Sequence, residues 1–529
     1  MNARRIFTAA ILGFIITFFL TAGHVRPLGS QGQSAIPVNM NYGWGRTWGG
    51  SGDEMANSTI TDAQGNIYVA GDFSASVDFD PGTGVTNATS NGGLDVFLSK
   101  FSPDGTFLWA RTWGGTGRDI ASSVGVDSAG NVYVAGPFQN TVDFNPDPNA
   151  SDMHSSNNPN GQNNMFLSKF SPDGTFQWAR TWGPADAGGE AYSLAVDASD
   201  NIYVQGDFSG TTTNFDPWDP LHPDNHTNHP PLSSSDPRLF DAFLSKFDKN
   251  GNYVWAKTWG GEGYDDGDSV AVDGNGNVYV AGMYASQQIN FDPAGGNAGL
   301  GHPASDSGIK VDVFLSKFDP DGDFQWVRTW GGQGTDDAPG TIAVDRANNV
   351  TVGGRFESVN CDFDPGSGVD LHSTNGSFDA FISKFDPSGT FLWARTWGGS
   401  GWDSAGGLAV DSLNNVYTIG VFVNQVEFDP GGNPAVVTSQ GGDDIFLSQF
   451  APDGAFQWVQ TWGGSGDDTS YHLAIDGLGQ LFSAGSFQGT VDLDPGSGVD
   501  NHVSNGGSDA FLIKFLPSSY SAFLPLAIR

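Results

Sequence analysis

The chain has 529 residues, including 75 Gly, 59 Asp and Glu, and only 22 Lys and Arg, so its formal net charge is −37. This excess of acid excludes nucleic acid and anionic membrane surfaces as partners, because both require basic patches. The single cysteine, Cys361, excludes an internal disulfide, and we expect it to be a small buried residue.

The first 23 residues have the pattern of a secretory signal peptide. Arg4 and Arg5 precede an apolar run from Ile6 to Leu20, and small residues follow. No Ala-x-Ala site is present, so an uncleaved anchor is the alternative. Residues 24–40 are polar and predict a flexible lead-in. We therefore expect a protein that is secreted or held at the cell surface, whose mature domain does not enter the membrane.

One motif recurs along the rest of the chain, in the form Pro-Asp-Gly-Thr-Phe-x-Trp-Ala-Arg-Thr-Trp-Gly-Gly. Its Thr-Trp-Gly ending occurs seven times, at intervals of 65 to 77 residues, and a second Trp stands four residues earlier in each copy. The first copy holds Trp44 and Trp48, and the others hold Trp109 and Trp113, Trp178 and Trp182, Trp255 and Trp259, Trp326 and Trp330, Trp393 and Trp397, and Trp458 and Trp462. A repeat of this length predicts one array of similar units rather than several unrelated domains.

Each unit contains four short strands separated by turn residues. In the second unit we expect them at 123–127 (a), 131–136 (b), 165–170 (c) and 176–182 (d), with tight turns at Asn, Gly and Pro-Asp-Gly. No sustained helical period follows the signal. Seven units of four strands predict an all-β fold, a seven-bladed β-propeller over residues 41–516, with the repeated Trp side chains packed between blades.

The order of strands also predicts how the ring closes. The array begins with a lone d strand, residues 42–48, and ends after a lone c strand, residues 509–515. The N-terminal strand would therefore complete the last blade and remove an open sheet edge. Residues 517–529 form a short apolar tail, which we interpret as a docking strand or a frayed end. We expect the protein to be monomeric.

The repeated residues resemble the SBBP propeller repeat of secreted and surface proteins of bacteria. The resemblance rests on Asn-Val-Tyr-Val-Ala-Gly, Asp-x-Phe-Leu-Ser-Lys-Phe, Asp-Gly-x-Phe-x-Trp and Thr-Trp-Gly-Gly, and it extends over about residues 42–516. It implies the fold, but it implies no catalytic residues.

The d–a and b–c loops are long, vary between units and lie on one face, where function is usually found. They are also acidic. Ca²⁺ is bound by carboxylates and by carbonyls of Gly-rich loops, so calcium is the candidate cofactor. The candidate ligands in the d–a loops are Asp53, Asp119, Asp265, Asp336, Asp403 and Asp467. The competing interpretation is that these residues only cap turns.

The third b–c loop, about residues 211–239, departs most from the repeat. His222, His226 and His229 suggest a transition-metal site, or else solvated side chains in a Pro-rich loop. Trp218 is either a lid on the propeller or a stacking residue for a ligand, and Trp402 has the same two interpretations. The Arg side chains that could reach this face are Arg118, Arg238 and Arg355.

The sequence favours binding over catalysis. No Gly-x-Ser-x-Gly, His-Glu-x-x-His or phosphate-loop motif is present. The Pro-Asp-Gly motif partly resembles the Asp box of sialidases, and the d-strand Trp resembles the docking motif of quinoproteins, but both are blade-packing motifs. We expect a non-catalytic propeller that presents its acidic loop face to a protein, a glycan or a cation. The alternative is a hydrolase or lyase that acts on a polysaccharide at the mouth of the propeller.

Overall fold

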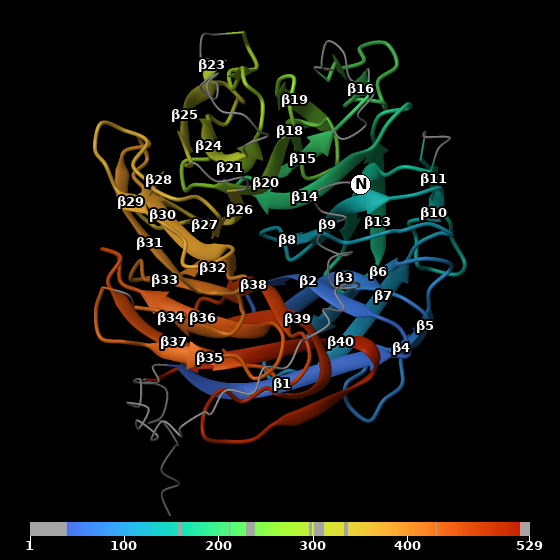
Figure 1. Ribbon diagram of the computed structural model, residues 1–529. Helices are drawn as coiled ribbons and strands as arrows, with labels where there is room; N and C mark the ends of the chain where they lie inside the picture. Colours follow the sequence, from blue (N-terminus) through green and yellow to red (C-terminus); the bar gives the residue numbers. More distant parts are fainter. Residues whose placement is uncertain are drawn as a thin grey trace, which may run out of the picture.

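The computed structural model describes residues 40–156, 161–210, 212–228, 239–295, 299–300, 311–332, 337–429 and 431–518. These residues form seven four-stranded antiparallel sheets arranged around a central axis (Figure 1). Within the described ranges, no helix is long and apolar enough to span a membrane. The protein is an all-β, seven-bladed β-propeller, as the repeat predicts.

Short, Gly-punctuated strands build each blade from the axis outwards. The inner strands are β2 (Glu54–Thr61), β8 (Ser123–Val126), β14 (Gly189–Val196), β20 (Asp265–Val272), β26 (Ala338–Val344), β32 (Ser404–Val410) and β38 (Thr469–Ile475). The second strands are β3 (Ile67–Phe73), β9 (Val132–Phe138), β15 (Ile202–Phe208), β21 (Val278–Tyr284), β27 (Val350–Phe356), β33 (Val416–Phe422) and β39 (Leu481–Asp492). The second strands are almost wholly buried, and most of their residues are apolar.

The two remaining strands complete each blade. The third strands are β6 (Asp95–Phe101), β12 (Asn164–Phe170), β18 (Asp241–Phe247), β24 (Asp312–Phe318), β30 (Asp379–Phe385), β36 (Asp444–Phe450) and β40 (Asn501–Pro517). The outer strands are β7 (Phe107–Trp113), β13 (Phe176–Trp182), β19 (Tyr253–Trp259), β25 (Phe324–Trp330), β31 (Phe391–Gly399), β37 (Phe456–Trp462) and β1 (Met40–Gly50).

The ring closes through β1, which confirms the closure predicted from the order of strands. β1 pairs antiparallel with β40, with Thr47 opposite Phe511 and Trp48 opposite Ala510. The seven inner strands contact one another in a closed ring, including β38 with β2 (Figure 1). Lys514 Nζ donates to the carbonyl of Pro103, 2.7 Å away, and so ties the last blade to the first.

Each b–c connection contains a short β-hairpin, which the sequence did not predict. Six are separate strand pairs: β4 (Ser76–Asp78) and β5 (Asn87–Thr89), β10 (Thr141–Asp143) and β11 (Met153–Ser155), β16 (Thr213–Asn214) and β17 (Asn225–His226), β22 (Ile289–Asn290) and β23 (Gly299–Leu300), β28 (Cys361–Asp362) and β29 (Leu371–His372), and β34 (Gln425–Glu427) and β35 (Val436–Thr438). In the seventh blade the hairpin is an extension of β39 and β40. Hairpins pair with the outer strand of the preceding blade, as Gly49 does with Asp78 and Gly398 with Glu427.

The two Trp of each repeat have different positions. The second Trp is buried between blades: Trp113 meets Phe166 of the next blade edge-on and packs at a tilt on Phe170, with ring centroids 6.4 and 5.0 Å apart. The corresponding buried residues are Trp48, Trp182, Trp259, Trp330, Trp397 and Trp462. In six copies the first Trp lies against the Gly of the c–d turn of the next blade, and it is half-buried at Trp44, Trp109, Trp178, Trp255 and Trp326 and buried at Trp393. Trp458 is buried and donates its Nε1–H to Gln449 Oε1 instead.

The outer-strand Arg holds the same turn. Arg111 Nε donates to the carbonyl of Gly174, 2.8 Å away, and the Arg111 guanidinium lies 5.1 Å from the centre of the Trp109 ring. The same bond joins Arg46 to Gly105, Arg180 to Gly251, Arg328 to Gly389 and Arg395 to Gly454. Five of the seven copies of the motif therefore clamp the turn of the following blade through Arg.

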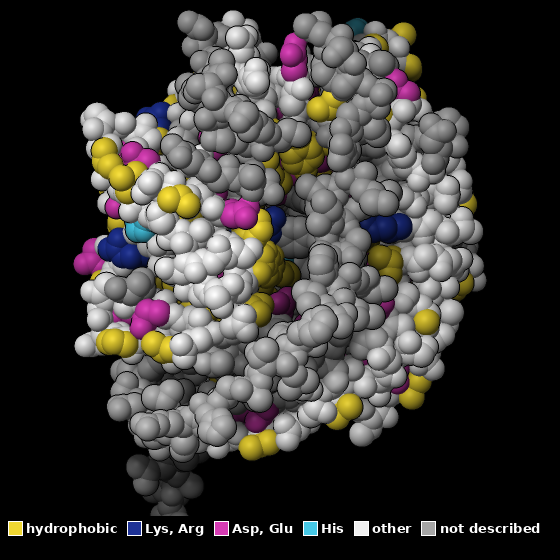
Figure 2. All heavy atoms as spheres, viewed as in Figure 1, with side chains coloured by type: hydrophobic (Ala, Val, Ile, Leu, Met, Phe, Trp, Pro, Cys, Tyr) yellow, Lys and Arg dark blue, Asp and Glu magenta, His cyan; other side chains and the backbone are white. Residues whose placement is uncertain are grey.

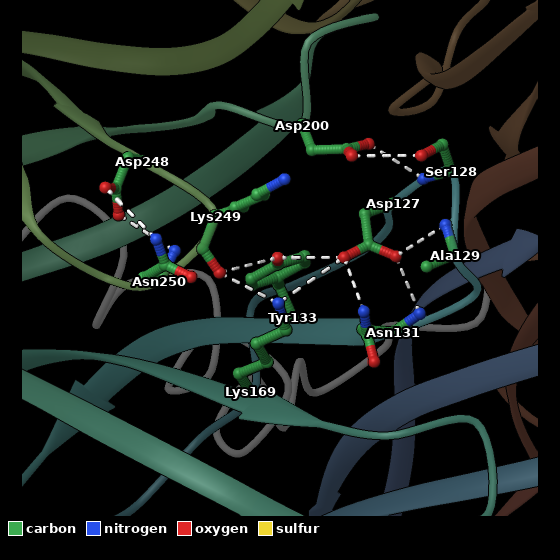
Figure 3. Close-up of polar contacts among 10 residues, drawn as sticks. All are labelled: Asp127, Ser128, Ala129, Asn131, Tyr133, Lys169, Asp200, Asp248, Lys249 and Asn250. Carbon is green, nitrogen blue, oxygen red and sulfur yellow. Dashed lines mark hydrogen bonds and ion pairs between the residues drawn. The ribbon is translucent and has the colours of Figure 1, made fainter.

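A polar cluster at the same end of most blades, away from the d–a and b–c loops, adds a second clamp (Figure 3). The Asp127 carboxylate accepts hydrogen bonds from the Asn131 amide and side chain and from the Tyr133 hydroxyl, at 2.8 to 3.0 Å. Lys169 Nζ lies 3.5 Å from this carboxylate and donates to the carbonyl of Lys249 in the next blade, 2.8 Å away. Burial raises the pKa of Asp127, but these bonds outweigh it and hold the pKa below its ordinary value.

Candidate functional site at the mouth of the propeller

The inner strands are irregular where they leave the d–a loops. Six of them carry a β-bulge near this end, in which one residue is left out of the pairing. The bulged residues are Asn57, Tyr192, Asp268, Gly340, Gly406 and Tyr471. They stand at the end of the propeller that carries the d–a and b–c loops, which we call the mouth.

The mouth is where the blades stop resembling one another. The bulged residues range from Gly to Tyr, whereas the clamp residues described above are nearly constant. The second strands vary at the same level, where they carry Asp72, Pro137, Asp207, Met283, Arg355, Val421 and Ser486. Acidic, basic and hydrophobic side chains all gather around the middle of this face (Figure 2). A site that distinguishes one ligand requires such unequal surroundings, so we take the mouth as the candidate functional site.

In the first three blades the variable residues bind one another. Asn57 Nδ2 donates to Asp72 Oδ1, 2.7 Å away, and to the carbonyl of Ala121 in the next blade, 3.1 Å away. Tyr192 donates its hydroxyl to Asp207 Oδ2, 2.9 Å away. Burial raises the pKa of Asp72 to about 6, although the bond from Asn57 and the charge of Arg118 oppose the rise. Arg118, a predicted binding residue, therefore lies at the mouth beside Asp72.

Blades five to seven place a cation among aromatic rings. The Arg355 guanidinium carbon lies 5.0 Å from the ring centre of Phe378 and 5.8 Å from that of Trp402. Burial raises the pKa of Tyr471, as does Asp443, whereas the nearby Arg355 lowers it. We call these four side chains, Arg355, Phe378, Trp402 and Tyr471, the Arg355 cluster. All four are half-buried.

Small residues make room for this cluster. The Tyr471 ring lies against Gly406, where it takes the space that a Cβ would need. Gly340, the bulged residue of the fifth blade, is exposed. Arg355 and Trp402 were predicted binding residues, and the structure brings them together. The sequence analysis missed Phe378 and Tyr471; an alignment of the inner strands would have shown only that the bulged position varies, since Tyr192 of the third blade is also a Tyr.

The predicted calcium ligands mostly hold the d–a loops. Asp119, Asp265 and Asp403 are buried, and each accepts a bond of 2.7 Å from the backbone N–H four residues earlier. Their other oxygen accepts the N–H of Gln139, Ser286 or Val423, just after the neighbouring second strand. Burial raises the pKa of Asp119 and Asp403 to about 6 and that of Asp265 to about 7.

The other three candidate calcium ligands are Asp53, Asp336 and Asp467. Asp53 and Asp467 stand one residue before Glu54 and Asp468, and these two side chains accept the bonds from Gly50 and Gly464 instead. Asp53 Oδ1 accepts the Ser508 N–H at 3.1 Å, and Asp336 lies outside the described residues. In the described part of the chain, no three His, Cys, Asp or Glu side chains form a group that could hold a metal ion. Calcium binding stays a prediction.

His226 belongs to an arrangement that occurs in four blades. Its Nδ1 lies 2.8 Å from Thr258 Oγ1 and its Nε2 lies 3.1 Å from Asp224 Oδ1. The equivalent sets are His154 with Thr181 and Asp152, His372 with Thr396 and Asp370, and His502 with Thr47 and Asp500. The signal that we overlooked is Asp-x-His, which occurs once in each of these hairpins.

The remaining His residues of this loop do not join His226. His222 is exposed and pairs with Asp219, 3.0 Å away, and His229 lies outside the described residues, as does Arg238. The transition-metal site therefore also stays a prediction.

Trp218 lies on the propeller as a lid. Its ring meets Trp182 edge-on with centroids 6.4 Å apart, and it lies 6.1 Å from Phe247. The Arg180 guanidinium is 5.7 Å from its centre. These partners belong to outer and third strands, so Trp218 packs on the rim of the blades and is 36% exposed.

One comparison with known proteins supports the fold. Residues 254–283 match the SBBP beta-propeller repeat. The chain is 23% identical over 516 residues to "Uncharacterized WD repeat-containing protein L264" of Acanthamoeba polyphaga mimivirus, which covers 84% of this chain and 36% of that protein. It is 24% identical over 426 residues to "Regulatory protein FlaEY" of Caulobacter vibrioides, covering 75% and 41%. The chain thus spans less than half the length of these curated relatives.

Solved structures give weaker likenesses. A polysaccharide lyase of family PL25, an ulvan lyase, has 11% identity and a TM-score of 0.41, covering 88% of this chain and 97% of that one. A protein of unknown function from Dyadobacter fermentans has 10% identity and a TM-score of 0.38, covering 90% and 99%. Both scores lie below 0.5, where a likeness carries no argument about function. The matched repeat and the seven blades together identify the chain as a β-propeller, and the two curated relatives, one viral and one bacterial, leave its source open.

Proposed function

We propose that the protein is an exported, non-catalytic binding propeller that takes its partner at the mouth. The partner would be a protein or a glycan, with Ca²⁺ as the candidate cofactor. The observation that carries the proposal is the contrast between constant clamps and a variable mouth. Residues that hold the blades together repeat in blade after blade, whereas the bulged residues and the Arg355 cluster do not.

Two further features support binding over catalysis. The buried carboxylates of the d–a loops accept backbone N–H groups, so they act as loop anchors with their oxygens occupied. The Thr–His–Asp sets occur in four separate blades, as expected of a structural device repeated with the hairpins. Export is supported by the sequence pattern of residues 1–23.

The test is thermal unfolding followed by Trp fluorescence, with candidate ligands added singly. A ligand that binds only the folded state raises stability by roughly 2.7 kcal/mol at a hundredfold excess over its dissociation constant. CaCl₂ against excess chelator tests the cofactor. The double variant Arg355→Ala/Trp402→Ala removes two of the four side chains of the Arg355 cluster. It should lose any ligand-induced rise in the unfolding temperature, whereas Trp218→Ala should keep that rise.

The enzyme alternative is tested in the same samples. Release of reducing ends or of unsaturated sugars from a polysaccharide panel would contradict the non-catalytic assignment. Loss of that turnover in a mouth variant would place the reaction at the mouth. If every ligand that raises the unfolding temperature of the wild type raises that of the double variant equally, the mouth is not the binding face.

A further inference from the structure

The charge pattern of the Arg355 cluster narrows the class of ligand. Arg355 lies over Phe378 and Trp402, so the electron-rich ring faces already hold a cation. A second cation, such as a Lys side chain or a quaternary ammonium group, would meet the guanidinium charge at the place where aromatic rings attract cations. The cluster is therefore a poor site for a cationic ligand.

Anions are disfavoured by the acids beside the cluster. The Asp443 N–H donates to Asp467 Oδ1, 3.4 Å away, which places two carboxylates at the edge of the mouth. Asp443 lies close enough to Tyr471 to raise the pKa of its hydroxyl. The chain as a whole carries a formal charge of −37. A polyanion would approach against this field, and within the cluster it would meet a guanidinium that already lies against two rings.

An uncharged, polyhydroxylated ligand is repelled neither by the Arg355 guanidinium nor by the carboxylates beside it. Trp402 and Tyr471 are half-buried, and both combine a flat apolar ring with a polar group. The C–H face of a pyranose ring can stack on such a ring, while its hydroxyls bond to a guanidinium or a carboxylate. Gly340 is exposed, so the bulge of β26, in the strand pair that carries Arg355, presents no side chain.

We propose that the Arg355 cluster binds an uncharged oligosaccharide, stacked on Trp402 and Tyr471 and hydrogen-bonded to Arg355. This proposal rests on the proposed function of the mouth as the binding face. The ring of Phe378 also packs against the guanidinium, with its centre 5.0 Å from the guanidinium carbon. The amphipathic rings supply affinity, and Arg355 supplies orientation.

Affinity electrophoresis of the full chain tests the proposal. Native gels contain no polysaccharide, a neutral one (dextran, galactomannan or laminarin) or an anionic one (alginate). We expect at least one neutral polymer to retard the wild-type protein, and Trp402→Ala to lose at least tenfold in affinity. Trp218→Ala is the matched control, because that Trp packs on Trp182 at the rim, and it should migrate as the wild type does.

The possible outcomes separate this inference from the proposed function. Retardation by alginate alone, abolished by Trp402→Ala, would overturn the neutral-sugar proposal and leave the mouth as the binding face. Retardation by no polysaccharide would also overturn it, and a protein partner whose binding depends on Trp402 would still uphold the proposed function. Retardation by a neutral polymer that Trp402→Ala and Arg355→Ala leave unchanged would overturn both. Near-identical thermal unfolding of wild type and Trp402→Ala shows that the variant is folded.

Discussion

The Trp109 indole lies so close to Gly174 of the next blade that a Cβ on Gly174 would stand 3.0 Å from its Cδ2 and Cε2 atoms. Gly174 also has φ of +79°, which side chains rarely adopt. The Pro-Asp-Gly turn thus needs its Gly for two reasons, one conformational and one of contact between blades. The same relation joins Trp44 to Gly105 and Trp178 to Gly251, so the repeat encodes a ring of clamps.

Replacing this glycine should loosen the clamp. Gly174→Ala adds a Cβ against Trp109 and places Ala in the left-handed region, which costs about 1–2 kcal/mol before any displacement of the indole. We expect the free energy of unfolding to fall by about 2 kcal/mol in denaturant titrations. Gly477→Ala is the control, because Gly477 has no heavy atom within 4 Å of a new Cβ. Equal stability of the two variants would contradict the clamp.

Removing the indole should cost more than removing an exposed side chain of the same strand. Trp109→Ala deletes a large ring packed against the second blade, and large-to-small changes in a core cost about 3–5 kcal/mol. Leu108→Ala, at a residue 47% exposed, should change stability by less than about 0.5 kcal/mol. A cost below about 1 kcal/mol for Trp109→Ala, measured by denaturant titration, would exclude the indole from the packing between blades.

The Lys169 clamp can be tested by replacing Lys169, with the replacement of an exposed lysine as a control that removes the same charge. Lys169→Met removes the bond from Nζ to the carbonyl of Lys249 and leaves the buried Asp127 without its cation. We expect a loss of about 1–3 kcal/mol, since a buried acceptor loses a charged donor. Lys249→Met makes the same change to an exposed side chain and keeps the carbonyl. Comparable thermal unfolding of both variants would show that the bond contributes little.

Stability should rise as the pH falls from 8 towards 5. Burial raises the pKa of Asp265, Asp379 and Asp468 to about 7, so each binds a proton more tightly in the folded than in the unfolded chain. Between the unfolded and folded pKa values the folded state holds more protons, and stability is therefore lost as the pH rises through this window. Melting temperatures measured at pH 5, 6, 7 and 8 should decrease in that order. Below pH 4 the trend should reverse, because carboxylates such as Asp127 have lowered pKa values.

Asp379→Asn isolates one of these groups. β12 begins with Asn164 where β30 begins with Asp379, so the fold already accepts an amide at this position. The variant should gain stability at pH 8, on the order of 1–2 kcal/mol, and gain little at pH 5, because each pKa unit corresponds to 1.36 kcal/mol. Asp104→Asn removes an exposed carboxyl whose pKa is lowered, and it should show no gain at pH 8. A gain for Asp379→Asn that is the same at both pH values would contradict a titrating carboxyl.

Features that depend on residues close together in the sequence could be predicted from it, whereas contacts between distant residues could not. The strands, their order and the packing role of the Trp pairs follow from a pattern that repeats within each unit, and the lone outer strand at residues 42–48 could only complete the last blade. The Asp residues of the d–a loops were ambiguous, because only one of the N–H groups that they accept is close in the sequence, and the other follows the second strand, 20 or 21 residues later. His226 was grouped with His222 and His229 by proximity in sequence, whereas its partner Thr258 lies on the outer strand.

By itself, the sequence determined the all-β class, the seven blades and their closure, because a periodic pattern of apolar and turn residues leaves few ways to bury its aromatic faces. Only the tertiary structure decided the mouth. Arg355, Trp402 and Tyr471 come from different blades, and the closing of the ring around one axis brings them together. Which carboxylates hold loops and which face the mouth likewise depends on strand register and burial, and these are properties of the assembled blades.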